Sequence, residues 1–194
     1  MGLNISVAAA NELTGTDEAS CTMTWSPAGG DNALHRATGE AFQQWTDWAD
    51  EQDISLNFIE APEPELSSLP RIKSRGVPYE VKKDHVTVSF ATDEDPTEFQ
   101  ETELGVGGLV FIRDGGPFNL LHNKYRFASL NIENIADSPG SLKITLLHEI
   151  GHALGVAQHN DDPASVMHHE LAGQSDFNDA DKHTLEDLFG HCAR

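Results

Sequence analysis

The stretch LHEIGHALGVAQHN, residues 147–160, decides how the fold of this chain is interpreted. His148 and His152 are four residues apart in a helix-forming run, so a helix places them one turn apart and about 40° round its axis. Both imidazoles can then reach one metal ion, and zinc readily takes histidine nitrogen as a ligand. Glu149 is rotated from the first histidine by about 100°, where its carboxylate can act as a general base toward an attacking water. The spacing therefore predicts a catalytic zinc site on a helix.

A catalytic zinc site needs a third protein ligand and an open position, and the residues after this helix supply candidates. Gly155 stands where the helix must end, because glycine permits the left-handed turn that sends the chain back toward the metal. His159 is the predicted third ligand, with Gln158 and Asp161 as alternatives, since neutral imidazole suits zinc better than an amide oxygen. HExxH alone also arises by chance on ordinary helices, so the flanking residues have to support the metal site.

The flanking residues predict one mixed α/β domain. Apolar residues alternate in five short segments, which predicts strands at residues 21–25, 54–59, 85–90, 108–112 and 126–132. Helix periodicity and end signals predict three helices: residues 31–48 after an N-cap at Asp31, residues 138–155 opening with Ser-Pro, and residues 178–189 before Gly190. Residues 1–20 are small and polar and are expected to form an arm. Residues 21–194 contain no internal linker, so we expect them to form a single domain.

The motif and its surroundings resemble the metzincin zinc metallopeptidases, and among them the matrixins, the matrix-metalloproteinase-like branch. The resemblance rests on HExxHxxG and on Met167 in the downstream turn Ser-Val-Met, strongly over residues 142–167 and loosely over residues 21–191. It implies an α+β fold with a twisted, mixed five-stranded sheet, two long helices and a small C-terminal subdomain that holds a third helix. The upper subdomain would be residues 21–155 and the lower one residues 156–194.

The same resemblance implies a zinc-dependent endopeptidase that hydrolyses peptide bonds in proteins. Glu149 would be the general base, and His148, His152 and His159 would hold Zn²⁺. Met167 would pack beneath the ligand histidines, and Gly155 would form the turn after the helix. The expected partner is a protein or peptide substrate, and the chain is expected to be a monomer.

Two departures from the family pattern affect the site. The family spacing puts the third histidine at position 158, where this chain has Gln158, and the histidine follows one residue later as His159. Eight residues separate His159 from Met167, which is the family interval, so a one-residue insertion before His159 explains the shift. The family's tyrosine after the methionine is replaced here by His168, followed by His169. These two are either exposed loop histidines or substitutes for the tyrosine, and a zinc-binding pseudopeptidase or interaction module is the alternative function.

The charge of the chain excludes two classes of partner. There are 32 Asp and Glu against 12 Lys and Arg, so the formal net charge is −20 at pH 7. Such a surface repels nucleic acids and anionic lipid, so we expect neither nucleic-acid nor membrane binding. The acidity suits a high-salt habitat or a fold helped by bound cations. The acidic loop at residues 92–96 and the turn at residues 114–116 are candidate Ca²⁺ sites, with ordinary solvated loops as the alternative.

Two further features leave alternatives open. Cys21 and Cys192 lie near opposite ends of the chain, and are either unrelated thiols or one disulfide. A disulfide would imply an oxidising compartment and an extracellular protein, although the first residues show no secretory signal. The strand at residues 108–112 is either a plain sheet strand or an outer edge that holds an extended peptide by main-chain pairing.

Overall fold

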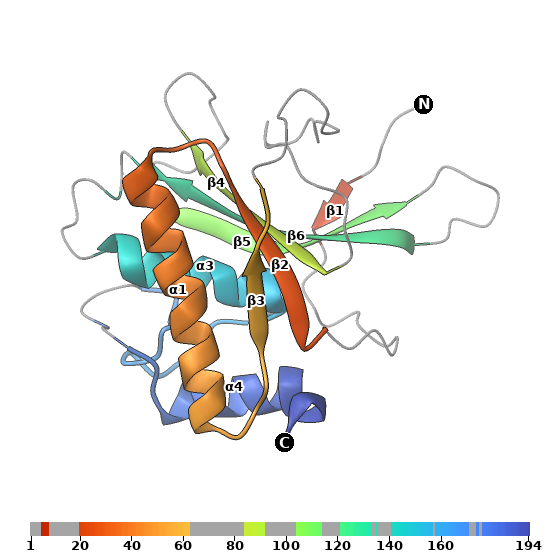
Figure 1. Ribbon diagram of the computed structural model, residues 1–194. Helices are drawn as coiled ribbons and strands as arrows, with labels where there is room; N and C mark the ends of the chain where they lie inside the picture. Colours follow the sequence, from red (N-terminus) through yellow and green to blue (C-terminus); the bar gives the residue numbers. More distant parts are fainter. Residues whose placement is uncertain are drawn as a thin grey trace.

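A computed structural model describes residues 5–7, 20–62, 84–91, 104–113, 121–132, 135, 141–156, 158–170, 174 and 176–194. Within these residues six strands form one mixed sheet in the order β1-β5-β6-β4-β2-β3 (Figure 1). Their bounds are β1 (Ile5–Val7), β2 (Thr22–Ala28), β3 (Asn57–Glu60), β4 (His85–Ala91), β5 (Gly105–Arg113) and β6 (Leu121–Asn131). The four strands β6, β4, β2 and β3 run parallel, whereas β5 is antiparallel to β6 and to β1.

The mixed α/β class is confirmed, and each of the five predicted strands is present. The expected number of strands is wrong, because the described sheet has a sixth strand drawn from the arm. Residues 5–7 pair with β5 in the register Ile5↔Ile112 to Val7↔Val110. The interpretation of residues 108–112 as an outer edge does not hold at residues 110–112, where β1 occupies that side of β5. An edge strand offers a row of unpaired backbone groups, and an extended segment of the same chain can satisfy them.

In the described part of the chain three α-helices with defined bounds accompany the sheet: α1 (Asn32–Glu51), α3 (Ser141–Leu154) and α4 (Asp179–Phe189). The Asp31 side chain accepts hydrogen bonds from the backbone N–H groups of Ala33 and Leu34, as the predicted N-cap of α1 should. The predicted Ser-Pro start of the second helix lies outside the described residues. Gly190 has a negative φ of −57°, so the chain continues from α4 into a 3₁₀ turn, η2 (Gly190–Cys192), instead of reversing.

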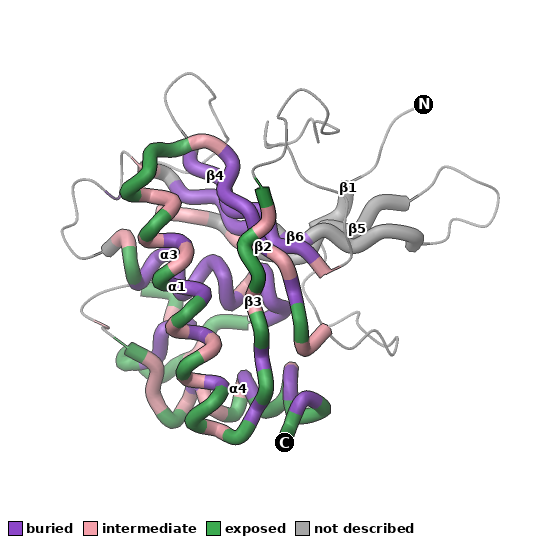
Figure 2. Tube along the Cα trace, in the orientation of Figure 1, coloured by how far each residue is buried: buried purple, intermediate pink, exposed green. Residues whose placement is uncertain are grey.

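The two long helices cover different strands of the sheet and contact each other. Helix α1 packs on β3 and on β2, where the rings of Phe42 and Trp25 stack with centroids 5.0 Å apart, and α3 packs on β5 and β6. Figure 2 shows most of β4 and much of β2 and α3 as buried. The indole N–H of Trp45 in α1 donates to the carbonyl of Leu147 in α3 over 3.2 Å, inside this core. The histidine-bearing helix is thus fixed on two sides.

Cys21 and Cys192 form a disulfide, with their Cα atoms 5.7 Å apart. This decides between the two alternatives that the sequence left open. The bond ties the residue before β2 to η2, which follows α4 (Figure 1). No helix of the described residues is long and apolar enough to cross a membrane.

Candidate metal centre

Three histidines bring their ring nitrogens together at the C-terminal half of α3. The Nε2 atom of His152 lies 3.1 Å from Nε2 of His148 and 3.3 Å from Nε2 of His159. One nitrogen from each ring lies within 4.8 Å of the other two. A tetrahedral zinc with Zn–N bonds of ~2.0–2.1 Å places its nitrogen ligands about 3.4 Å apart. The donor set therefore fits a zinc ion in both chemistry and spacing.

The other ring nitrogens determine which tautomer two of these histidines adopt. Nδ1 of His148 lies 2.8 Å from the carbonyl oxygen of Val166, and Nδ1 of His152 lies 2.6 Å from that of Val156. A carbonyl oxygen can only accept, so Nδ1–H must donate in both contacts. The Nε2 lone pairs are then left for a metal. A partner that orients a ligating imidazole in this way also increases its basicity.

A metal needs neutral imidazoles, and the pKa of each of the three histidines is lowered from its ordinary value. The pKa of His148 is lowered from 6.5 to about 3, mainly by burial and next by the neighbouring His152. Burial also lowers the pKa of His152 and, together with His169 and His168, that of His159. Charging a buried imidazole is costly, so the buried His148 stays neutral at pH 7.

The turn after α3 delivers the third histidine. Helix α3 ends at Leu154, and Gly155 has φ +123°, a value that L side chains rarely adopt. Gly155 therefore has a backbone conformation that suits glycine at the turn after α3. Of the three candidates in the following loop, His159 carries the nitrogen that joins the cluster, while Asp161 does not belong to that group. All three candidates, Gln158 included, are exposed. The extra residue before His159 is absorbed without removing the histidine from the site.

Arg126 of β6 closes the end of the same helix, a role that the sequence did not suggest. Its side chain is buried, and Nη1 donates to the carbonyl oxygens of Ala153 over 2.9 Å and Leu154 over 2.7 Å. These are carbonyls of the last turn, which have no partner inside the helix. Burial lowers the pKa of Arg126 to about 10 while Asp84 opposes the shift, so the side chain stays a cation at neutral pH. A cation is favoured at this negative end of the helix dipole.

Two glycines of β5 allow the sheet to approach Glu149 closely. The side chain of Glu149 is 5% exposed. A Cβ atom on Gly105 would lie 2.8 Å from Cγ and 2.9 Å from Oε1 of Glu149. A Cβ atom on Gly107 would lie 2.2 Å from the Glu149 carbonyl oxygen. Any other residue at these positions would displace the carboxylate or the helix, and the sequence pattern gave no sign of this contact.

Met167 lies against α3 at Gly151, the residue before His152. The residue is 1% exposed, and a Cβ atom on Gly151 would lie 2.5 Å from its Sδ atom. The indole of Trp45 lies 3.2 Å from the same Cβ position, so the thioether and the indole both pack on α3 where Gly151 has no side chain. The methionine therefore serves as packing for the helix and is not a ligand.

A buried carboxylate from α4 holds the turn that contains Met167. Asp181 is 1% exposed and accepts from the hydroxyl of Ser165 and from the backbone N–H groups of Val166 (3.1 Å), Met167 (3.4 Å) and Asn178 (3.0 Å). Val166 is the residue whose carbonyl orients His148. Asp181 thus acts on the site through the turn. Its position at the third residue of a capping box was visible in the sequence, but its contact with a distant turn was not.

The two histidines after Met167 lie beside the cluster. The ring centroid of His169 is 6.3 Å from that of His159, and the His168 and His169 rings are 4.3 Å apart. His168 contacts the backbone of Glu170 through Nδ1, and His169 is exposed. Neither ring nitrogen belongs to the group that could hold a metal.

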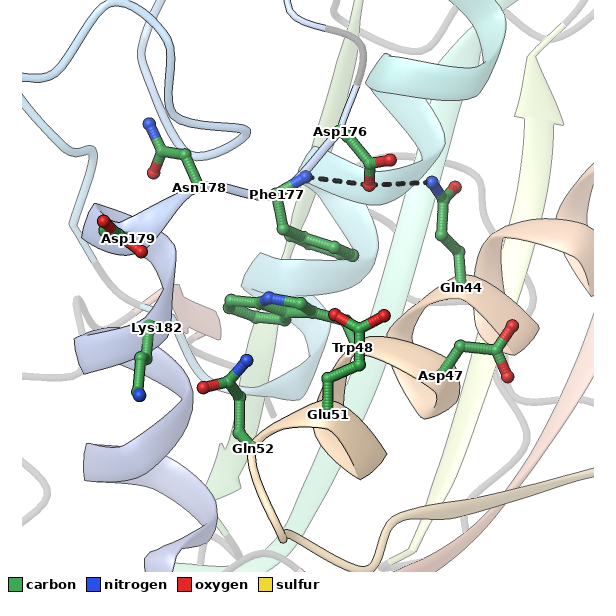
Figure 3. A pocket seen from close by; sticks show the side chains of 10 residues that line it. All are labelled: Gln44, Asp47, Trp48, Glu51, Gln52, Asp176, Phe177, Asn178, Asp179 and Lys182. Carbon is green, nitrogen blue, oxygen red and sulfur yellow. Dashed lines mark hydrogen bonds between the residues drawn. The ribbon is translucent and has the colours of Figure 1, made fainter.

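A surface hollow lies between α1 and the start of α4, with none of the three histidines in its lining (Figure 3). It has a volume of about 540 Å³, and the stacked rings of Trp48 and Phe177, 4.2 Å apart, form part of its wall. Phe177 also packs on Trp45 with centroids 4.6 Å apart. Because Trp45 donates a hydrogen bond to Leu147, the packed rings of Trp45, Trp48 and Phe177 contact the helix that carries His148 and His152.

The chain was compared with known families and proteins. No family model matches it, and no curated protein matches its sequence. The resemblance to metzincins therefore rests on the motif residues and their spacing.

Both candidate calcium segments, residues 92–96 and 114–116, lie outside the described residues.

Proposed function

We propose that this chain is a zinc-dependent endopeptidase of the metzincin type, in its matrixin branch. The observation that carries the proposal is the convergence of three Nε2 atoms from His148, His152 and His159, with the buried Glu149 beside the first of them. Three imidazoles leave a fourth position open, which is the donor set of a catalytic zinc and not of a closed structural one. A chance HExxH on a solvated helix would not bring a third histidine to the same point.

When bound, zinc would supply Lewis acidity, which polarises a peptide carbonyl and acidifies a water. The chain's own residues supply the rest. Glu149 would take the proton of the attacking water and then pass it to the leaving amine. Burial of Glu149 against Gly105 limits the number of positions its carboxylate can adopt, so the base is held ready before substrate arrives. Val166 and Val156 keep Nδ1 of the first two histidines protonated, which fixes the ligating nitrogens.

The finer description of the fold belongs to the same proposal. In this proposal the mixed sheet, with α1 and α3 packed on it, would be the twisted sheet and the two long helices of a metzincin-like fold. Residues 21–155 would form the upper subdomain and residues 156–194 the lower one, with α4 in the latter. The substrate would be a protein or peptide. The disulfide supports an extracellular, secreted protein, and we expect it to act as a monomer with Zn²⁺ as its cofactor.

The alternative is a zinc-binding pseudopeptidase or interaction module on the same scaffold. The observation that favours it is the exposure of His159, which reaches the cluster from a loop with one residue more than the family pattern. Replacement of the family's tyrosine by His168 points the same way. Both functions require zinc, so only turnover separates them.

Cleavage of casein and gelatin by zinc-loaded protein, together with zinc content per chain, tests the proposal. We expect about one zinc at the three-histidine site, cleavage that a chelator abolishes, and recovery on adding zinc. Glu149→Gln should keep the zinc and lose the cleavage, whereas Glu40→Gln, an exposed position on α1, should change neither. Bound zinc without cleavage in the unmodified protein would establish the pseudopeptidase. Absence of zinc binding would refute both functions.

A further inference from the structure

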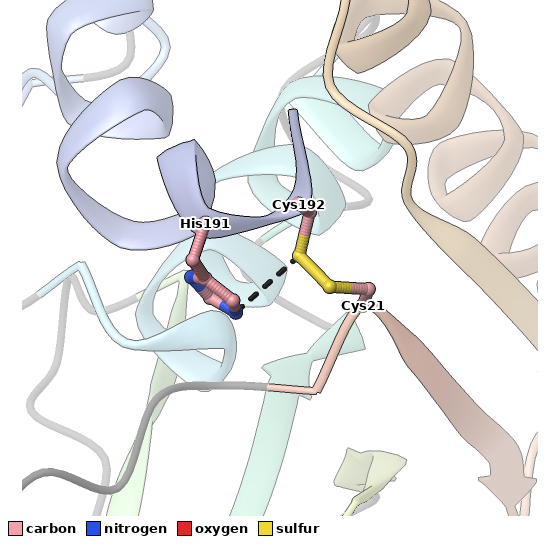
Figure 4. Close-up of side chains that lie close together, drawn as sticks. All are labelled: Cys21, His191 and Cys192. Atoms are coloured by element: carbon pink, nitrogen blue, oxygen red, sulfur yellow. Dashed lines mark hydrogen bonds between the residues drawn. A yellow bond between two sulfur atoms is a disulfide. The ribbon is translucent and has the colours of Figure 1, made fainter. Parts of the chain in front are cut away.

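We propose a second metal site, made by Cys21, Cys192 and His191, that is closed while the disulfide is intact and opens when it is reduced. In the reduced state the two thiolates and the imidazole would bind a thiophilic divalent cation such as Zn²⁺. The site lies at the junction of β2 and η2 (Figure 4). It shares no residue with the three-histidine cluster, so it stands whether or not the proposed peptidase function is correct.

The three side chains are already spaced almost as a zinc ion requires. Nε2 of His191 lies 3.3 Å from Sγ of Cys192, and one ligand atom from each of the three residues lies within 4.8 Å of the others. Tetrahedral zinc with Zn–S of ~2.3 Å and Zn–N of ~2.0–2.1 Å places sulfur and nitrogen about 3.5 Å apart. The same geometry separates two sulfurs by about 3.8 Å. Rotation of the cysteine side chains can provide this separation once the sulfurs are no longer bonded.

Backbone hydrogen bonds position both cysteines in addition to the sulfur–sulfur bond. The N–H of Ser55 donates to the carbonyl of Cys192 over 3.0 Å, and the N–H of Asn57 donates to the carbonyl of Cys21 over 2.9 Å. One short segment of chain therefore positions both cysteines, and their Cα atoms are 5.7 Å apart. Reduction would leave the thiols facing each other, so a metal would meet ligands that are already arranged.

Exposure lets both a reductant and a metal reach these residues. The imidazole of His191 is exposed, Cys21 is half-buried and Cys192 is 6% exposed. A phosphine with one water reduces the disulfide: two electrons from phosphorus break the sulfur–sulfur bond, each sulfur takes a proton, and the phosphine becomes its oxide. Metal binding then displaces the two thiol protons to solvent, because only thiolate is a ligand.

Cobalt titration of oxidised and reduced protein tests this proposal. The protein is reduced with tris(2-carboxyethyl)phosphine, desalted without oxygen, assayed for two free thiols, and titrated with Co²⁺. Reduced protein should bind about one Co²⁺ more per chain than oxidised protein. The additional ion should show the near-ultraviolet thiolate-to-cobalt absorption that histidine ligands cannot give. In a His152→Ala background, which lacks the three-histidine site, the thiolate-ligated ion should remain.

Variants of the exposed histidines show whether the imidazole takes part. His191→Ala should weaken Co²⁺ binding to the reduced protein by at least tenfold. Removing a residue that only hydrogen-bonds to a metal ligand already lowers metal affinity about 10-fold or more, and removing a ligand itself should cost no less. His183→Ala, an exposed histidine on α4, should leave it unchanged. Two free thiols without the thiolate absorption would overturn the proposal. If reduction alone unfolds the chain, added Zn²⁺ should restore the circular-dichroism spectrum, and failure to restore it would overturn the proposal equally.

Discussion

Replacing Asp181 by asparagine tests whether a residue far from the histidines in sequence organises the candidate zinc site. The carboxylate is 1% exposed and accepts four hydrogen bonds, two at each oxygen: Ser165 and Met167 at Oδ1, and Val166 and Asn178 at Oδ2. Asparagine keeps one oxygen and turns an N–H₂ group toward the other pair of donors. At least two hydrogen bonds to a charged group are therefore lost or reversed.

Each such bond contributes about 1.5–3 kcal/mol, so Asp181→Asn should lower the free energy of unfolding by about 3–6 kcal/mol. The turn carrying Val166 should also loosen, and its carbonyl would orient His148 less well. Loss of an outer partner of this kind weakens metal binding by about 10–100-fold. Urea denaturation of metal-free protein measures the first effect, and zinc competition against a chromophoric chelator measures the second.

Asp179→Asn is the matched control, because Asp179 is an exposed acid in the same first turn of α4. Its removal should cost about 0.3–1 kcal/mol through the helix dipole and leave zinc affinity unchanged. The reasoning is refuted if Asp181→Asn costs less than about 1 kcal/mol, the range of ordinary surface changes. Unchanged zinc affinity in Asp181→Asn with the fold intact would equally refute the link to His148.

Four further outcomes are expected. Gly105→Ala should crowd the Glu149 carboxylate and reduce kcat about 10²-fold, with zinc affinity retained; undiminished cleavage would contradict this contact. In metal-free protein the pKa of His148 is lowered from 6.5 to about 3 by folding. The free energy of unfolding should therefore fall as the pH drops below about 6.5, and it should go on falling until the pH reaches about 3. Urea midpoints at a series of pH values measure this. Cys21→Ser opens the disulfide to Cys192 across a separation of 171 residues and should cost about 5 kcal/mol by chain entropy, measured as a lower melting temperature. Because the chain carries a net charge of −20, its melting temperature should rise from low to molar salt, and a flat profile would remove the idea of adaptation to high salt.

The sequence was sufficient for features that depend on local geometry. The pitch of a helix fixes the angle between residues four apart, so HExxH alone placed His148 and His152 on one face of α3. Asp31 could be identified as an N-cap because its partners are two and three residues away. The five predicted strands are present because alternation follows the two-residue repeat of a strand.

The tertiary structure decided every feature that depends on contact between distant segments. The choice of His159 over Gln158 depends on how one extra loop residue is accommodated. Asp181 and Arg126 look like ordinary charged residues until folding brings them to the turn and helix end that they stabilise.

The disulfide and the sixth strand belong to the same group. Whether Cys21 meets Cys192 depends on where α4 ends relative to β2, and whether residues 5–7 pair with β5 depends on which side of β5 is left open. Spacing along the chain fixes angles within one element. The separation between elements is set by side-chain packing across the whole core, and a single sequence pattern does not contain it.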